Sequence, residues 1–324
     1  MKTLFVSILL VLVFSACTAD YNMKSTDVDE PNRLVVNSFL NPEKPIRINF
    51  YTLDRTDTGF VCRTAENLYV KLTEDDRTLF EGWCADSMLI LDHHPRVNVK
   101  YRIDVSLTGY ASVWAETTVP SSIMCKVRAE PFSQSYHSSE MKYFLSDFAG
   151  NHEREKTSLY VQVYSMLGGD TLMPGGDMYA SNVLLDPMNR TNGIEVKDAD
   201  VGSSCHERFI RVKNRNLPYL DHLIFITAMP YGYYHHYTEE NRVVWISFDV
   251  KKYLVKLITA GPDYDMYRRT LYQQAAYIVY DDDISAFTYH PVQVYSNISG
   301  GLGIFAGINE TDYFFDAPEQ SDQP

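Results

Sequence analysis

Aromatic and histidine side chains are concentrated in one short segment, residues 230–237 (PYGYYHHY). Its candidate binding side chains are those of Tyr231, Tyr233, Tyr234, His235, His236 and Tyr237. Because the segment opens with proline and contains glycine, we expect it to form a loop. Exposed tyrosines offer large, rigid contact areas, so this loop would suit stacking on sugars or gripping a peptide. The alternative is an aromatic cluster packed between sheets.

Histidines and acidic residues elsewhere lack the spacing of a known metal or catalytic motif. The pairs His93 with His94 and His235 with His236 would point to opposite faces of a strand, and no H-E-x-x-H motif occurs. Residues 281–283 (DDD) lack the calcium-loop spacing, and G-x-S-x-G is absent. A Ser/His/Asp triad of distant residues stays open. We expect no catalytic residue, no metal and no cofactor.

A glycine-rich motif lies near the carboxy terminus, at residues 291–307 (PVQVYSNISGGLGIFAG). The residues that define it are Asn297, Gly300, Gly301, Gly303 and Phe305. Glycines permit positive φ and close backbone approach, and the apolar positions between them suit a core. We expect a strand, a tight glycine turn and a second strand that locks the last sheet. A phosphate-binding loop is the alternative, but its Lys-Ser/Thr pair is missing.

Five cysteines divide into one near the start and four in the body of the chain. Cys62, Cys84, Cys125 and Cys205 would permit two disulfides in an exported protein. Cys62 and Cys84 flank a predicted hairpin, and a bridge between them requires the intervening stretch to fold back. Free buried thiols are the alternative. No C-x-x-C pair suggests a metal or redox site.

The amino terminus predicts export. Lys2 precedes an apolar run over residues 3–16, which is about 21 Å long as a helix and too short to cross a bilayer. Residues 1–16 therefore resemble a lipoprotein signal peptide, with small residues directly before Cys17. Cys17 would carry acyl chains that anchor the protein, and residues 18–32 would form a polar tether. Ordinary secretion, with Cys17 discarded, is the alternative.

Composition excludes two broad classes of protein. The 324 residues are 45% hydrophobic and 22% charged, so the chain is not disordered as a whole. A formal net charge of −13 disfavours binding to nucleic acid. The 24 tyrosines suit β-sheets and binding surfaces.

Short alternating runs predict an all-β protein. Residues 33–120 contain runs such as 46–50 and 101–107, separated by turns, which predict an immunoglobulin-like β-sandwich. Residues 121–316 should form a larger, mainly antiparallel β domain. Its clearest predicted strands are residues 158–164, 208–213, 222–228 and 242–248. Residues 250–258 fit either a strand or a helical turn, and we expect a strand.

One short helix is predicted near residues 262–278. Pro262 and Asp263 open it, and Tyr264, Tyr267 and Leu271 recur at helical spacing. Asp263 and Asp265 suit the positive end of its dipole. Residues 317–324 (APEQSDQP) offer almost nothing to bury, so a disordered tail is expected.

The closing motif resembles that of the DUF4249 family, lipoproteins of Bacteroidota. Other matching pieces follow in the family's order: the cysteine signal, residues 34–42 (LVVNSFLNP) with Pro45 and Ile46, residues 101–103, 109–110 and 118–120, and residues 257–259 with 263–267. The resemblance covers essentially the whole mature chain. Residues 141–216 and the stretch near Tyr234 match no family pattern.

This resemblance implies a lipoprotein anchored in the cell outer membrane, facing the cell surface, beside a TonB-dependent, SusC-like transporter. The expected role is non-catalytic: capture of an unknown small solute, glycan or peptide, or gating of the transporter. The alternatives are a surface hydrolase that feeds a transporter and a structural or adhesive envelope module.

Overall fold

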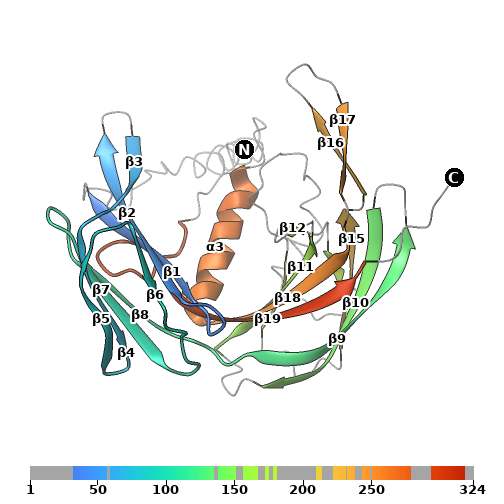
Figure 1. Ribbon diagram of the computed structural model, residues 1–324, viewed down its shortest axis with the longest axis horizontal. Coiled ribbons are helices and arrows are strands. Elements are labelled where there is room, and N and C mark those ends of the chain that lie inside the picture. The colour runs from blue at the N-terminus through green and yellow to red at the C-terminus, as the bar shows by residue number, and fades with distance from the viewer. Residues whose placement is uncertain are drawn as a thin grey trace, which may run out of the picture.

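The computed structural model describes twelve stretches of the chain: residues 32–56, 59–134, 138–150, 156–166, 172–174, 178–180, 209–213, 222–230, 232–237, 243–248, 250–278 and 293–317. The signal segment, Cys17 and the tether up to residue 31 lie outside them, as do residues 281–283 and 318–324. Figure 1 shows β-sheets that form a broad curve, with one helix in its middle.

A long sheet runs through the described part of the chain and contains nine strands. Its path is β12-β11-β18-β19-β1-β2-β3, with β14 beside β11 and β6 beside β2. The strands are β1 (Arg33–Leu40), β2 (Ile46–Thr56), β3 (Gly59–Thr64), β6 (Met88–Leu91), β11 (Ser158–Met166), β12 (Leu172–Pro174), β14 (Ile210–Lys213), β18 (Lys252–Ala260) and β19 (Leu302–Asp316).

Two smaller sheets back the two ends of the long sheet. The first has the order β5-β4-β7-β8, and the second has the order β13-β15-β10-β9. Their strands are β4 (Leu68–Glu74), β5 (Arg77–Cys84), β7 (Lys100–Ser106), β8 (Val113–Thr118), β9 (Ile123–Gln134), β10 (Ser138–Gly150), β13 (Met178–Ala180) and β15 (His222–Pro230). A separate hairpin joins β16 (Gly232–Tyr237) to β17 (Val243–Phe248).

Alternation along β1 decides which face each side chain takes. Leu34, Val36 and Leu40 are buried in the core against β4, β7 and β8, whereas Asn37 and Phe39 point to the other face. β2 repeats the pattern, with Ile46 and the other apolar positions inward. A second core lies between β11, β18 and the sheet of β9, β10 and β15. The period-two pattern of the sequence thus builds two sandwiches on one long sheet.

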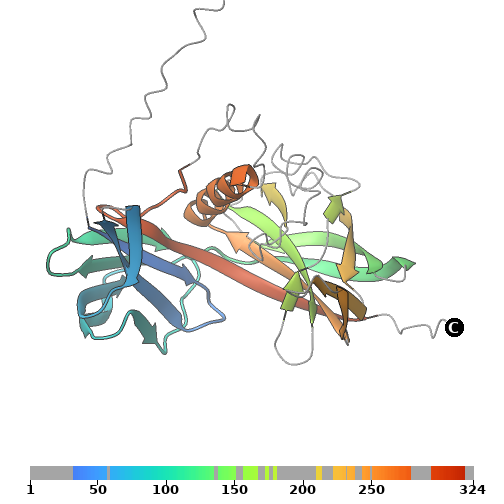
Figure 2. The same cartoon turned by 90° about the horizontal axis from the view of Figure 1, so that it is seen from above.

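β19 belongs to both sandwiches. Residues 302–307 pair with β1 in parallel, and residues 308–316 pair with β18 antiparallel. Figure 2 shows this strand, in red, extending from one part of the molecule to the other. The chain passes between the two parts after Thr118 and before Ile123, close to the boundary expected at residue 120. The last strand therefore ties the two parts into one framework.

The helix α3 (Pro262–Ile278) has the predicted position and packs on the opposite face of the long sheet from the two backing sheets. Its Tyr264 lies in a third core with Ile304 and Ile308 of β19. Asp265 fixes the first turn: Arg211 of β14 donates two hydrogen bonds of 2.6 Å to its carboxylate. Tyr160 donates a third, of 2.7 Å, to Asp265 Oδ1.

The all-β class and the helix expected near residues 262–278 are confirmed, and the predicted strands correspond to β11, β14, β15, β17 and β18. The structure gives the amino-terminal part as a two-sheet sandwich, and the immunoglobulin-like description stays a prediction. Ala317, the first residue of the expected tail, donates a backbone hydrogen bond of 2.8 Å to Lys251 O. Within the described residues, no helix has the length and apolar content needed to cross a membrane.

The first half of the closing motif is not the strand that we predicted. Residues 293–298 form no strand, and only Ser299 makes an isolated bridge, to Trp114. The reason is that the Asn297 side chain takes the place of a neighbouring strand in pairing with the backbone of Phe305. Its NH₂ group donates to Phe305 O at 2.8 Å, and its oxygen accepts from Phe305 N–H at 2.9 Å. The glycine turn and the second strand, β19, are present, and Gly300 has φ +79°.

Candidate functional site

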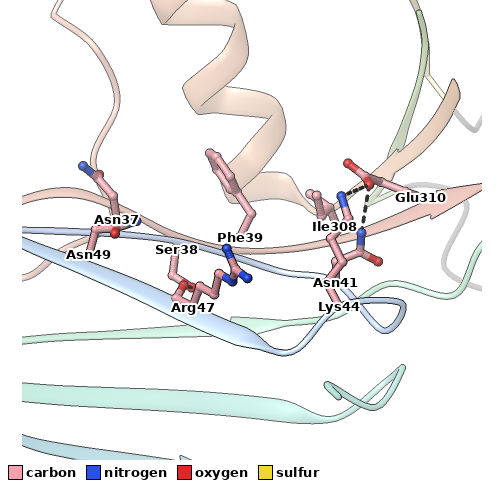
Figure 3. A pocket seen from close by; sticks show the side chains of 9 residues that line it. All are labelled: Asn37, Ser38, Phe39, Asn41, Lys44, Arg47, Asn49, Ile308 and Glu310. Carbon is pink, nitrogen blue, oxygen red and sulfur yellow. Dashed lines mark hydrogen bonds and ion pairs between the residues drawn. The ribbon is translucent and has the colours of Figure 1, made fainter. Parts of the chain in front are cut away.

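A pocket of about 290 Å³ opens on the face of the long sheet that carries α3. Its lining comes from β1, the β1–β2 turn, β2 and β19: Asn37, Ser38, Phe39, Asn41, Lys44, Arg47, Asn49, Ile308 and Glu310. Figure 3 shows Asn37 and Asn49 at one end and Glu310 at the other. The lining combines one aromatic ring with amide, hydroxyl and charged groups, which is the composition of a site for a polar solute.

Glu310 is neutralised at its end of the pocket. Lys44 Nζ lies 2.6 Å and Lys256 Nζ 3.3 Å from Glu310 Oε2, and Asn41 donates to the same oxygen at 3.0 Å. Burial alone would raise the pKa of Glu310, but the hydrogen bond from Lys44 and the charge of Lys256 outweigh it and hold this pKa below the ordinary value. The carboxylate is therefore ionised at neutral pH and already engaged.

The other end of the pocket presents hydrogen-bond donors without partners. Among the described residues, the Arg47 guanidinium has no hydrogen-bond or ion-pair partner, and neither has the Asn49 amide. Asn37 Oδ1 accepts from the backbone N–H of Ile304 at 3.2 Å, so its NH₂ group is left to donate. Asn37 and Asn49 are opposite each other on β1 and β2.

Phe39 forms an apolar wall beside these donors. Its side chain is 43% exposed, and its ring packs edge-on against Tyr264 of α3 with centroids 5.2 Å apart. The Phe39 ring is held in place because α3 is itself fixed by the hydrogen bonds that Asp265 accepts from Arg211 and Tyr160. Tyr295 of the closing segment adds a second attachment, since its hydroxyl donates to Asp263 at 2.7 Å.

The closing motif contributes to this site as a support. Gly303 has φ +106°, and a Cβ there would overlap the carbonyl oxygen of Val36, so only glycine permits the parallel contact of β19 with β1. That contact brings Ile304 to Asn37 and orients the amide of Asn37. Asn297, Gly300, Gly303 and Phe305 thus act in the framework. No helix follows the glycines, in agreement with the structural interpretation of the motif.

The tyrosine- and histidine-rich segment is a strand where a loop was predicted. Tyr233, Tyr234, His235, His236 and Tyr237 lie in β16, which pairs with β17 in regular antiparallel register. The high β-propensity of tyrosine outweighs the breakers Pro230 and Gly232, which lie at the ends. Tyr231 is outside the described residues. The binding role of these six residues stays a prediction.

The cysteines that the structure describes are unpaired. Cys62, Cys84 and Cys125 are free thiols, so Cys62 and Cys84 are not bridged, and Cys205 is outside the described residues. The hairpin between them forms as predicted, but it places Cys84 opposite Leu68, with Sγ 3.2 Å from Asp86 O. Burial raises the pKa of the Cys125 thiol to about 12, which makes it unreactive.

His93 and His94 have partners in the local structure. His93 lies 3.0 Å from the buried carboxylate of Glu74, and His94 contacts Pro42 O at 2.9 Å. Within the part of the chain that the structure describes, no group of three histidine, cysteine or acidic side chains could hold a metal ion.

Sequence reasoning missed the pocket. Its residues lie at the two ends of the chain, with Asn41 and Glu310 separated by 269 positions. The signal that could have found it is the outward set of the alternating strands: Asn37 and Phe39 on β1, and Arg47 and Asn49 on β2. Polar residues with one aromatic, on the solvent side of adjacent strands, are a plausible binding surface, but the pattern alone does not show which strand pairs with which.

Comparison with known protein families gives one finding. The family model described as a domain of unknown function, DUF4249, matches residues 19–313. No curated protein matches the chain.

Proposed function

Because the chain belongs to the DUF4249 family over residues 19–313, we propose that it is an outer-membrane lipoprotein that captures a solute for a TonB-dependent, SusC-like transporter of a Bacteroidota cell. Its role in this proposal is non-catalytic. The lipoprotein faces the cell surface and holds the solute near the mouth of the transporter barrel.

The observation that carries the proposal is the position of Cys17. It follows the apolar run and the small residues Ser15 and Ala16, and the family match begins two residues after it, at residue 19. Cleavage before Cys17 would leave the whole matched region as the mature protein. Several acyl chains, each contributing about 0.8 kcal/mol per buried CH₂, would anchor it durably.

The chemistry of the pocket supports capture over hydrolysis. A glycosidase-type mechanism needs two carboxyl groups, one of them with a raised pKa so that it can donate a proton. Glu310 is the one carboxylate in the pocket lining, and its two ammonium partners lower its pKa. A group held ionised in this way is a poor general acid. Its neighbours offer hydrogen bonds to a bound solute instead.

Anchoring makes even a weak pocket useful. A tethered binder raises the local concentration of its solute at the transporter, so that the two affinities reinforce each other. The lipid anchor, the polar residues 18–32 and the pocket would then act as one device.

A native pulldown from outer membranes tests the proposal. The full-length protein, tagged at its carboxy terminus and extracted in mild detergent, should recover a large β-barrel protein in near-equal amount. Cys17→Ser, which removes the lipidation site, should fail to recover it from the same membranes. An intact, membrane-bound lipoprotein that repeatedly comes down alone would contradict the transporter partnership.

A further inference from the structure

We infer that the pocket between β1, β2 and β19 binds a single acidic sugar unit, with the Arg47 guanidinium holding the sugar carboxylate. This inference rests on the proposed capture function and names the class of solute.

The charge of the pocket is opposite to that of the chain. The whole chain carries a formal charge of −13. Around the pocket, however, three cations (Lys44, Arg47 and Lys256) meet two anions (Glu310 and Asp312), which leaves 3 − 2 = +1. Lys44 and Lys256 form ion pairs with those two carboxylates, and of the three cations Arg47 is the one that has no counter-charge among the described residues. A carboxylate is the group that a guanidinium fork binds best in two-point geometry.

The donors beside Arg47 match the hydroxyl groups of a sugar. Asn37 has its NH₂ group available to donate toward the pocket, while its oxygen accepts the hydrogen bond from Ile304 N–H. Asn49, its cross-strand neighbour, has both amide atoms available within the described structure. Directly opposite side chains in an antiparallel pair are about 5 Å apart at Cβ, which is close enough for two amides to contact adjacent hydroxyls of one ring.

Shape favours one ring over a longer chain. The volume of about 290 Å³ is at the lower end of the roughly 300–1,000 Å³ usual for ligand pockets. Phe39 supplies an exposed aromatic surface, and the apolar C–H face of a sugar can pack on such a ring. Figure 3 shows Phe39 between the donor end and the Glu310 end, so a ring against it has its carboxylate within reach of Arg47.

Ligand-observed NMR with the detergent-solubilised mature lipoprotein tests the inference directly. The probes are D-galacturonate and D-galactose, which share a ring and differ in the carboxylate. We expect saturation transfer to galacturonate and at least about tenfold weaker binding of galactose, which lacks the charge-assisted bonds. Arg47→Gln should weaken galacturonate binding at least about tenfold, and Arg47→Lys should show a smaller loss because the charge remains without the fork.

Arg55→Gln is the matched control. Arg55 is an exposed arginine on the same strand, β2, outside the pocket, so its replacement changes the net charge equally and should leave binding unchanged. Equal binding of galactose and galacturonate, or unchanged binding in a folded Arg47→Gln protein, would overturn the inference. So would acetate or inorganic phosphate that binds as tightly as galacturonate, since a simple anion site would then be sufficient. A protein that recovers its transporter yet fails these tests would refute the sugar and leave the proposed function in place.

Discussion

Two polar clusters in the amino-terminal sandwich use similar side chains in opposite ways. The first surrounds Glu74, whose side chain is fully buried: Arg96 donates at 3.0 and 2.8 Å, Tyr101 at 2.5 Å, and His93 lies at 3.0 Å. The second is the pocket, where Arg47 and Asn49 have no partner among the described residues. Both combine arginine with polar neighbours, but only the first is complete.

The comparison separates groups that stabilise the fold from groups that await a ligand. A buried carboxylate is tolerated only when its hydrogen-bonding capacity is filled, as at Glu74 and at the Arg211–Asp265 pair. Donors without a protein partner are tolerated in an open pocket, since solvent can satisfy them and a bound solute can take the place of that solvent. We call a cluster closed when its polar groups are all paired, and open when some have no protein partner. Removing a group from a closed cluster should lower the stability of the fold. Removing a group from the open cluster, the pocket, should weaken binding and leave the stability unchanged.

The largest loss should follow Arg211→Met. Arg211 is 1% exposed, and its removal leaves the Asp265 carboxylate, which also accepts a hydrogen bond from Tyr160, without its cation beneath α3. Breaking a buried pair typically lowers the free energy of unfolding by about 3–5 kcal/mol, as urea denaturation would measure. The double variant Arg211→Met, Asp265→Leu should recover part of this loss. A single variant as stable as the wild type would show that the cluster is not closed.

Glu74→Gln should cause the next largest loss of stability. Burial opposes ionisation of Glu74, but the hydrogen bonds from Arg96, Tyr101 and His93 outweigh it and lower its pKa from 4.5 to about 2. A difference of this size corresponds to about 3 kcal/mol of stability, which Glu74→Gln would remove.

The pH dependence of unfolding gives the sign of this effect. Because the folded pKa is depressed, the contribution of Glu74 is fully present above pH 4.5 and is lost as the pH falls toward 2. Glu74→Gln should flatten the acid limb of stability against pH in that window. An identical acid limb in wild type and variant would refute the role of Glu74.

Asn297→Ala should have a moderate effect. The change removes both hydrogen bonds to Phe305 and leaves this part of β19 without its amide partner. We expect a loss of about 1–3 kcal/mol in the free energy of unfolding. Asn49→Ala is the control, since the same substitution in the pocket breaks no protein hydrogen bond in the described structure. Equal losses in the two variants would remove the distinction between closed and open clusters.

Arg47→Gln should have the smallest effect on stability. Substitution of an exposed residue that has no partner usually changes the free energy of unfolding by less than about 0.5 kcal/mol. The same urea titration would measure this change. A loss of several kcal/mol would mean that Arg47 stabilises the fold, which would contradict its role as a group that is available for a ligand.

The sequence predicted those parts of the fold that depend on local pattern. Alternation identified the strands around residues 46–50 and 158–164, and Pro262 with Asp263 marked the start of α3. It failed where a side chain replaces backbone pairing, as Asn297 does before β19. It also failed for the tyrosine-rich segment, where propensity for strand outweighed the turn residues at its ends.

The candidate site could not be predicted because it depends on long-range pairing. Arg47 and Asn49 are recognisable as outward residues of a strand, but their pocket exists only because β19 pairs with β1 in parallel and brings Glu310 to Asn41. Gly303 carries part of this information, since its positive φ is needed where β19 meets Val36. A glycine pattern indicates that another segment of backbone approaches closely, but it does not identify the strand to which that segment belongs.

The proposed capture role depends most on the lipid anchor, because a capture protein must be held beside its transporter. Mass spectrometry of the mature amino-terminal peptide from outer membranes measures this directly. We predict a peptide that begins at Cys17 and carries the mass of a diacylglycerol and an amide-linked acyl chain. A mature peptide with an unmodified amino terminus, or one that begins after Cys17, would contradict lipid anchoring and with it the proposed capture role.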